Sequence, residues 1–164
     1  MNTDLFSLPL ARPLGTARGE MTEREGVVVG IAPGTDAVPA RGVGEATPLP
    51  GWTESIAACE RALDAAAERA DATDRAGADA APPDPDDALF SDAPAARHAV
   101  SLARRDADAR AAGVPLADHL AARADLPTPA DAVPVNATVG DGAPDATAAA
   151  AREAVAAGFR TVKV

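Results

Sequence analysis

The last stretch of the sequence, residues 133–164, alternates strand-forming and helix-forming segments, and this pattern restricts the fold more than any other feature. "VPVNATV" at 133–139 is rich in β-branched residues and predicts a strand. A Pro-Asp pair suits the first turn of a helix over 144–157, Gly158 follows its end, and "FRTVKV" at 159–164 predicts a second strand. A strand–helix–strand unit places its strands parallel, and a parallel sheet needs further crossovers to cover both faces. We therefore expect the opening of an α/β barrel or a doubly wound sheet whose remainder is absent.

The first fifty residues carry strand and turn signals instead. "LFSLPL" at 5–10 and "GVVVGIA" at 26–32 predict two strands, and the polar, glycine-punctuated segment 11–25 predicts a hairpin connection between them. "GVGEATPLPGW" at 42–52 begins as a third strand and ends in a proline-glycine loop. Three successive strands with short links indicate an antiparallel meander.

Helical periodicity begins after this loop. "TESIAACERALDAAAERA" at 53–70 places apolar residues at helical spacing, with Thr53 as the expected N-cap and Glu54 in the first turn. Further helices are predicted at 94–112 and at 116–124. The middle of the chain is thus predicted to be helical.

Two segments interrupt this regular pattern. Residues 71–93 are acidic and rich in proline and alanine, which predicts a solvated loop or insertion. The proline-rich connector 125–134 is the expected domain boundary. We predict a domain over 1–132 and the start of a second over 133–164.

Composition excludes several classes of protein. A net charge of −10 would repel phosphate backbones, so we expect no nucleic-acid partner. No apolar run approaches the length of a membrane span and no signal-peptide profile is present, so we expect a cytoplasmic protein with no membrane partner. Cys59 is the single cysteine and is predicted to be a small core residue. The acidic balance, and arginine in place of lysine almost throughout, suggest a salt-adapted, halophilic source whose folding depends on salt.

Three motifs resemble the enolase superfamily, in which a capping domain precedes a (β/α) barrel. "GVGEATPLPGWTES" at 42–55 resembles the third strand and capping loop of the o-succinylbenzoate synthase branch. "VPVNATVGDGAPDA" at 133–146 resembles the first barrel strand and turn, and "FRTVKV" resembles the second barrel strand with its Lys-x-Lys motif. The resemblance implies an α+β capping domain, with a three-stranded antiparallel meander plus helices, followed by the first βαβ unit of an incomplete (β/α) barrel.

The same resemblance implies a reaction and a cofactor. Such enzymes abstract a proton α to a carboxylate and hold the enediolate on Mg²⁺. In the o-succinylbenzoate synthase branch, a lyase of menaquinone biosynthesis, loss of water then follows. Lys163 matches the first lysine of the motif and is the expected catalytic residue, while the second lysine and the metal ligands would lie outside this sequence. The chain by itself is therefore expected to be inactive.

Strand geometry also points to Lys163, which is the only lysine in the chain. In a strand, Thr161 and Lys163 share one face and Val162 and Val164 share the other. If the valines pack under crossover helices, Lys163 points into the barrel near the end of the strand where such barrels place their active sites. The alternative is an exposed lysine at a frayed terminus.

Four further residues are candidates for substrate binding. Arg18 lies in the first hairpin and would pair with a substrate carboxylate, and Trp52 lies in the capping loop and would exclude water. Asn136 and Thr138 share a face of the predicted first barrel strand and would line the site. The alternatives are a solvated arginine, a tryptophan packed in the cap, and structural hydrogen bonding.

The sequence leaves other functions open. Within the superfamily, a dipeptide epimerase or a muconate cycloisomerase would have the same capping domain and barrel strands. In a different class, the chain would be a complete, non-catalytic acidic α+β binding protein. The expected partner is a small-molecule carboxylate substrate, with self-association of the incomplete barrel as a further expectation.

Overall fold

The computed structural model describes residues 1–16, 19–31, 41–49, 51–75, 84–140 and 142–164. The chain divides into two compact units. One unit contains Met1–Pro9 with Glu23–Pro129, and the other contains Leu10–Thr22 with Ala130–Val164. The predicted boundary between residues 132 and 133 stays a prediction. None of the described helices is both long enough and apolar enough to cross a bilayer.

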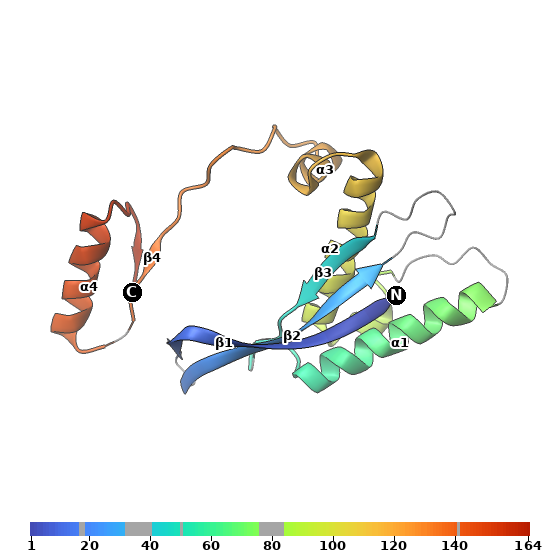
Figure 1. The fold of residues 1–164 in the computed structure, drawn as a ribbon, viewed down its shortest axis with the longest axis horizontal. Coiled ribbons are helices and arrows are strands. Elements are labelled where there is room, and N and C mark those ends of the chain that lie inside the picture. Colours follow the sequence, from blue (N-terminus) through green and yellow to red (C-terminus); the bar gives the residue numbers. More distant parts are fainter. Residues whose placement is uncertain (17–18, 32–40, 50, 76–83, 141) are drawn as a thin grey trace. The chain divides into compact units, whose positions relative to one another are not determined.

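The described strands of the N-terminal part form a sheet with strand order β1-β2-β3, as Figure 1 shows, and the parts of β1 and β2 within Leu10–Thr22 belong to the second unit. The strands are β1 (Asn2–Thr16), β2 (Gly19–Ile31) and β3 (Gly42–Ala46). β2 and β3 are antiparallel, with Val27 opposite Ala46 and Ile31 opposite Gly42. The predicted antiparallel meander is confirmed.

The first two strands are much longer than the sequence pattern predicted. The segment 11–25, expected to be a hairpin connection, is strand except at the two residues that lie outside the described part. Most of its described side chains are exposed, so neither face of this part of the hairpin needs to be apolar. Without a buried face the alternation that marks a strand in a sequence is missing.

Four helical segments follow: α1 (Ile56–Arg75), the short 3₁₀ helix η1 (Ala88–Phe90), α2 (Pro94–Ala112) and α3 (Leu116–Arg123). α2 begins at its proline and is followed by Gly113 at φ +68°, as predicted. α1 begins two residues later than Glu54, and the hydroxyl of Ser55 accepts a hydrogen bond from the Ala58 N–H at 3.3 Å. Ser55 therefore caps α1, and the prediction of Thr53 in that role is wrong.

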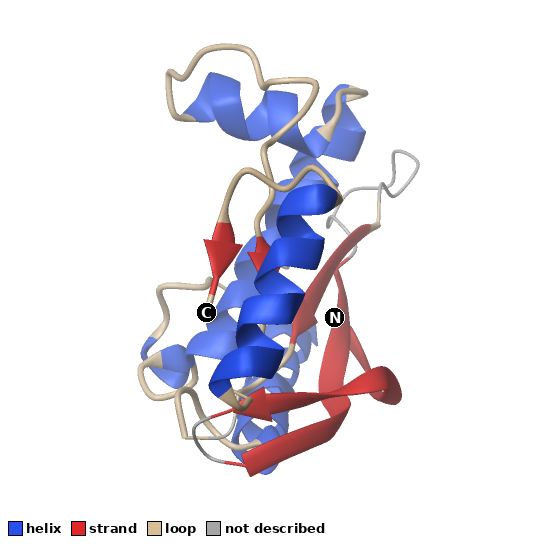
Figure 2. Cartoon of the chain, turned by 90° about the vertical axis from the view of Figure 1, so that its left-hand side faces the viewer, coloured by secondary structure: helices blue, strands red, loops and turns tan. Residues whose placement is uncertain are grey.

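The core of the first unit lies between its strands and its helices, which Figure 2 colours red and blue. Its large members come from β2, α1, η1 and α2. Cys59 is fully buried among them, which confirms its assignment to the core. The buried residues of this cluster are Val27, Val29, Ile31, Ala46, Cys59, Leu63, Ala66, Phe90, Ala93, Ala96, Ala99, Val100 and Ala103.

Close packing of α2 on β3 depends on two glycines. A Cβ atom at Gly44 would overlap the carbonyl oxygen of Ala99 and lie 2.8 Å from the backbone nitrogen of Ala103. A Cβ atom at Gly42 would overlap Ala103 in the same way and lie 2.7 Å from the Cβ of Ala107. The helix backbone thus rests directly on the strand, with alanines on the facing side of α2. This contact explains how a core with few large side chains reaches close packing.

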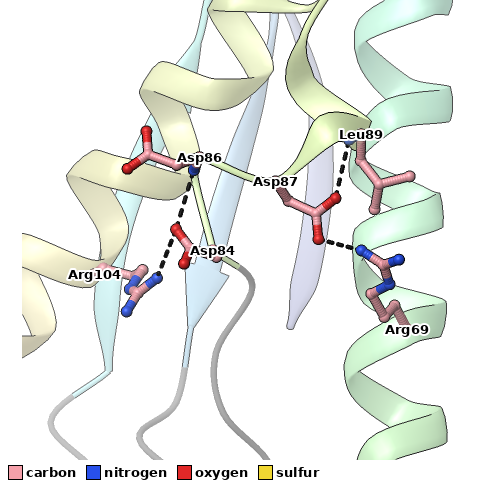
Figure 3. A network of polar contacts seen from close by, with 6 residues as sticks. All are labelled: Arg69, Asp84, Asp86, Asp87, Leu89 and Arg104. Carbon is pink, nitrogen blue, oxygen red and sulfur yellow. Dashed lines mark hydrogen bonds and ion pairs between the residues drawn. The ribbon is translucent and has the colours of Figure 1, made fainter.

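The acidic segment is more ordered than a solvated loop. The carboxylate of Asp87 accepts a hydrogen bond from the Leu89 N–H at 3.0 Å and pairs with Arg69 of α1, as Figure 3 shows. Asp84 pairs with Arg104 of α2 at 3.7 Å. Phe90, 1% exposed, is the largest fully buried side chain among the described residues. The prediction of a solvated loop over 71–93 is therefore wrong for 84–93 and for the part that continues α1 to Arg75.

The second unit contains the predicted strand–helix–strand element, but its strands are much shorter than the predicted 133–139 and 159–164. Its parts are β4 (Ala137–Thr138), α4 (Pro144–Ala156) and β5 (Val162–Lys163). β4 and β5 are parallel, with Ala137 opposite Val162 and Thr138 opposite Lys163. The expected fold class, a capping domain followed by the first βαβ unit, is confirmed.

Candidate functional site

Three of the predicted site residues lie together on one face of the β4–β5 pair. Thr138 and Lys163 are directly opposite each other in the parallel ladder, so their side chains project from the same face. The side-chain amide of Asn136 donates a hydrogen bond to the Thr138 hydroxyl at 3.2 Å. All three side chains are exposed. An amine, a hydroxyl and an amide therefore form one polar surface.

The other face of the same strands is less polar and less exposed. Ala137, Val139 and Val162 are half-buried, and α4 packs against β5. The alternation that the sequence predicted for the last strand, with valine on one side and lysine on the other, thus holds where the strands pair. It separates a packing face from a polar face that carries Lys163.

A groove of about 490 Å³ also lies in this unit. It is lined by residues 132–135 and 157–160, which precede β4 and β5 in the chain. The groove therefore lies toward the N-terminal ends of the two strands. Barrels place their active sites at the C-terminal ends, so this groove is not the candidate site.

Trp52, in the first unit, lies in a turn with a defined shape. The Leu49 carbonyl accepts hydrogen bonds from the Trp52 N–H at 2.9 Å and from the Thr53 N–H at 3.1 Å. The Thr53 hydroxyl accepts a hydrogen bond from the Leu49 N–H at 2.8 Å. Gly51 has φ +79°, which a residue with a side chain rarely adopts. The indole is 76% exposed, so the turn presents it to solvent rather than to the core.

The beginning of this loop is fixed to the sheet. Arg24 of β2 donates a hydrogen bond from Nη2 to the Thr47 carbonyl at 2.9 Å. The Thr47 hydroxyl in turn donates to the carboxylate of Glu45 on β3 at 3.2 Å. The loop that follows β3 is thus held by side chains of the two strands beneath it.

Arg18, the fourth candidate for substrate binding, lies outside the described residues. Glu54 is a residue of this region whose contacts the sequence pattern did not predict. It was expected in the first turn of α1, but its carboxylate accepts hydrogen bonds from Ala95 and Ala96 at the start of α2. No local signal could have indicated this contact, because the partners are more than forty positions apart in the sequence.

The histidine, cysteine, aspartate and glutamate side chains are the candidate ligands for a divalent metal in this chain. Within the ranges that the structure describes, no group of three or more histidine, cysteine, aspartate or glutamate side chains is arranged to hold a metal ion. Mg²⁺ would need acidic oxygen ligands of this kind. These residues do not supply such a site.

The known structures that match this chain are similar to it over nearly its whole length. No protein-family model and no curated protein matches the chain. Among solved structures, the L-Ala-D/L-Glu epimerase from Bacillus subtilis matches with a TM-score of 0.75 and 27% identity over 99% of this chain and 44% of its own. An enolase family member from Agrobacterium tumefaciens with homology to dipeptide epimerases matches with a TM-score of 0.68 and 25% identity, over 99% of this chain and 45% of its own.

A third structure is the dipeptide epimerase from Methylococcus capsulatus, complexed with Mg and the dipeptide L-Arg-D-Lys. It matches with a TM-score of 0.66 and 26% identity, over 98% of this chain and 43% of its own. The chain thus spans less than half the length of the structures it matches. Its fold is that of the N-terminal part of enolase-superfamily enzymes, and the comparisons support a place in that superfamily.

Proposed function

We propose that the complete protein is an enolase-superfamily enzyme that abstracts a proton α to the carboxylate of a small-molecule substrate, and that Lys163 takes part in this proton transfer. The observation that carries the proposal is the position of Lys163 on β5, opposite Thr138 of β4 and on the face away from the half-buried valine. The similarity to epimerase structures over nearly the whole chain supports it.

The residues of this chain would contribute binding and proton transfer. The amine of Lys163 would hold or release a proton next to the substrate. Asn136 and Thr138, which are joined by a hydrogen bond, would orient polar groups of the substrate next to this amine. Trp52 would exclude water from the site, and Arg18 would pair with a carboxylate.

Two outcomes can follow the abstraction of this proton. Return of a proton to the same carbon gives an epimerase, and the structures from Bacillus subtilis and Methylococcus capsulatus favour a dipeptide as substrate. Loss of water gives an o-succinylbenzoate synthase, which the "GVGEATPLPG" motif at 42–51 favours. We carry both as candidate functions of the complete protein. Mg²⁺ remains part of the proposal, because neighbouring structures are complexed with it.

The first experiment separates these functions in the full-length protein. Incubation in D₂O with Mg²⁺ and a panel of L,L-dipeptides would be followed by NMR for exchange and inversion at the α-carbon. A parallel assay would follow the conversion of the succinyl-hydroxycyclohexadiene-carboxylate to o-succinylbenzoate by absorbance. Absence of both reactions, and of α-proton exchange in every substrate, would contradict the proposal.

The second experiment tests Lys163 directly. We expect Lys163→Ala in the full-length protein to lower kcat by about 100-fold or more, the usual contribution of a positioned acid or base. Arg152→Ala on α4, also an exposed cation of the same unit, is the matched control and should keep its activity. Activity of Lys163→Ala at the level of the control would remove Lys163 from the mechanism.

A further inference from the structure

The carboxylate of Glu54 joins the end of the Trp52 turn to a distant helix. Its Oε1 accepts a hydrogen bond from the Ala96 N–H at 2.9 Å, and its Oε2 accepts one from the Ala95 N–H at 3.2 Å. Glu54 itself is half-buried and lies only two residues after Trp52 in the chain. The loop after β3 is therefore fixed at its far end to the first turn of α2.

Glu54 supplies the hydrogen-bond acceptor that is missing at the start of α2. Ala93, at the N-cap position, makes no side-chain capping bond, and Pro94 has no N–H. The first N–H groups of the helix are thus those of Ala95 and Ala96, and Glu54 accepts both. Hydrogen bonds from backbone N–H groups to a carboxylate are stronger than neutral ones, and the positive end of the helix dipole adds to them.

The same carboxylate also reaches α1. Burial, together with the charge of Glu54 and a side-chain hydrogen bond to it, raises the pKa of the Cys59 thiol to about 12. Glu54 thus contacts the first turn of α2 and acts electrostatically on Cys59 in the first turn of α1. At the other end of the loop, Arg24 holds the Thr47 carbonyl.

We propose that Glu54 is a positioning residue, which fixes the orientation of the Trp52 turn relative to the helices of the first unit. The hydrogen bonds of Leu49 with Trp52 and Thr53 set the shape of the turn, while Glu54 sets its direction. The inference rests on the proposed function, in which Trp52 lies against the substrate. A turn that is held before the substrate arrives costs less to order during binding, so Glu54 would act on substrate binding rather than on proton transfer.

The 164-residue chain offers a direct probe, because Trp52 is its only tryptophan. Time-resolved fluorescence anisotropy of Glu54→Ala should show faster local motion of the indole with larger amplitude than in the wild type. Glu54→Gln keeps one carbonyl oxygen as a hydrogen-bond acceptor, so the motion of its indole should be intermediate between that in Glu54→Ala and that in the wild type. Glu68→Gln, at an exposed position of α1, is the matched control and should resemble the wild type. Circular dichroism and melting curves would establish that each variant is folded.

In the full-length enzyme, Glu54→Gln should raise KM by about tenfold and change kcat by less than about twofold, which separates positioning from a role in the chemical step. Wild-type anisotropy in both folded Glu54 variants would overturn the proposal. If Glu54→Ala does not fold, the anisotropy of Glu54→Gln is compared with that of Glu68→Gln. Equal anisotropy in these two variants would overturn the proposal. The fluorescence result does not require activity, so failure of Lys163→Ala to affect turnover would overturn the proposed function and leave this result intact.

Discussion

Asp106 joins two elements that are far apart in the sequence. One oxygen of its carboxylate accepts hydrogen bonds from the Val43 N–H on β3 at 2.9 Å and from Nε of Arg110 at 2.7 Å. β3 lies at the edge of the described sheet, so this N–H has no neighbouring strand on that side. A helix side chain thus occupies a donor that would otherwise be open to pairing with another chain.

These contacts make the stability of the first unit depend on pH through Asp106. Burial acts to raise the pKa of Asp106, but the Val43 hydrogen bond and Arg110 outweigh it, so the pKa lies below its usual value of 3.8. A carboxylate with a lowered folded-state pKa stabilises the fold above its unfolded pKa. That contribution disappears as the pH falls through the folded-state value.

We expect Asp106→Asn to lower the free energy of unfolding at pH 7 by about 1–2 kcal/mol, because the charge is lost while one acceptor oxygen remains. The variant should also lose less stability than the wild type when the pH is lowered below 4. Urea unfolding at both pH values would measure this. Asp71→Asn, at an exposed position of α1, is the control. Identical pH profiles for Asp106→Asn and the wild type would contradict the assignment.

At the scale of elements, the backbone of α2 lies directly against β3. The carbonyl of Ala99 and the backbone of Ala103 occupy the space where side chains on β3 would project. Strand and helix can therefore approach only where the strand has no Cβ. The sequence "GVG" at 42–44 supplies this on alternate residues, with Val43 pointing to the exposed side.

Gly44→Ala should therefore lower the free energy of unfolding by about 3 kcal/mol or more, because the overlap is with backbone atoms that cannot rotate away. Gly140→Ala is the matched control. A Cβ atom there meets nothing within 4 Å, so we expect a change within about 0.5 kcal/mol. Chemical unfolding of both variants would measure the difference. Equal stabilities would show that α2 can shift away from the strand.

The acidic segment is a second element whose role depends on tertiary contacts. Phe90 of η1 is buried in the core, while Asp84 and Asp87 pair with arginines of the two long helices. The backbone hydrogen bond from Leu89 is the main cause that lowers the pKa of Asp87, and Arg69 adds to it. Exposed ion pairs of this kind contribute little, so burial of the phenyl ring is expected to dominate.

Phe90→Ala should lower the free energy of unfolding by about 3–5 kcal/mol, which is typical for removing a buried aromatic ring. Leu126→Ala removes a large apolar side chain that is 63% exposed and should have a much smaller effect. Thermal unfolding monitored by circular dichroism would compare them. A loss in Phe90→Ala no larger than in Leu126→Ala would restore the earlier interpretation of this segment as a solvated loop.

At the scale of the whole molecule, charge is the dominant property. The chain carries 25 acidic and 15 basic residues, which gives a net charge of −10. Repulsion among exposed carboxylates opposes the compact state, and salt screens it. The core relies heavily on alanine, which buries little area per residue, so there is limited hydrophobic stability to offset this repulsion.

We therefore expect the free energy of unfolding to rise when NaCl or KCl is increased from dilute buffer to molar concentrations. Guanidinium chloride is itself a salt, so urea or heat should be used as the denaturant. A chain with equal stability in dilute buffer and in molar salt would contradict the hypothesis of salt adaptation.

The second unit makes a separate prediction. No residue of α4 is buried, and within the part of the chain that the structure describes β4 and β5 pair only with each other. Such a pair has little independent stability in water. If the 164-residue chain is produced alone, we expect the amides of residues 133–164 to exchange rapidly or the chain to self-associate, while β2 and α2 stay protected. Hydrogen exchange with light scattering would test this, and a monomer with protected amides in that segment would contradict it.

Local pattern in the sequence was sufficient to predict the type and order of the main elements. β-Branched runs predicted strands, helical spacing predicted α1 and α2, and proline and glycine predicted the limits of α2 and α4. The predicted faces of the last strand, together with Asn136 and Thr138, also agree with the positions in the structure, because strand alternation is a local property. Their roles in catalysis stay predictions.

Contacts between distant segments were decided only by the tertiary structure. The lengths of β1 and β2, the burial of Phe90 and the bonds of Glu54 and Asp106 all depend on partners that lie far away in the sequence. An acidic side chain has the same local pattern whether it is solvated or accepts a buried N–H. The period of the apolar residues in the sequence determined which elements form. Packing determined which polar groups meet, because a hydrogen bond between distant residues requires two segments to fold against each other.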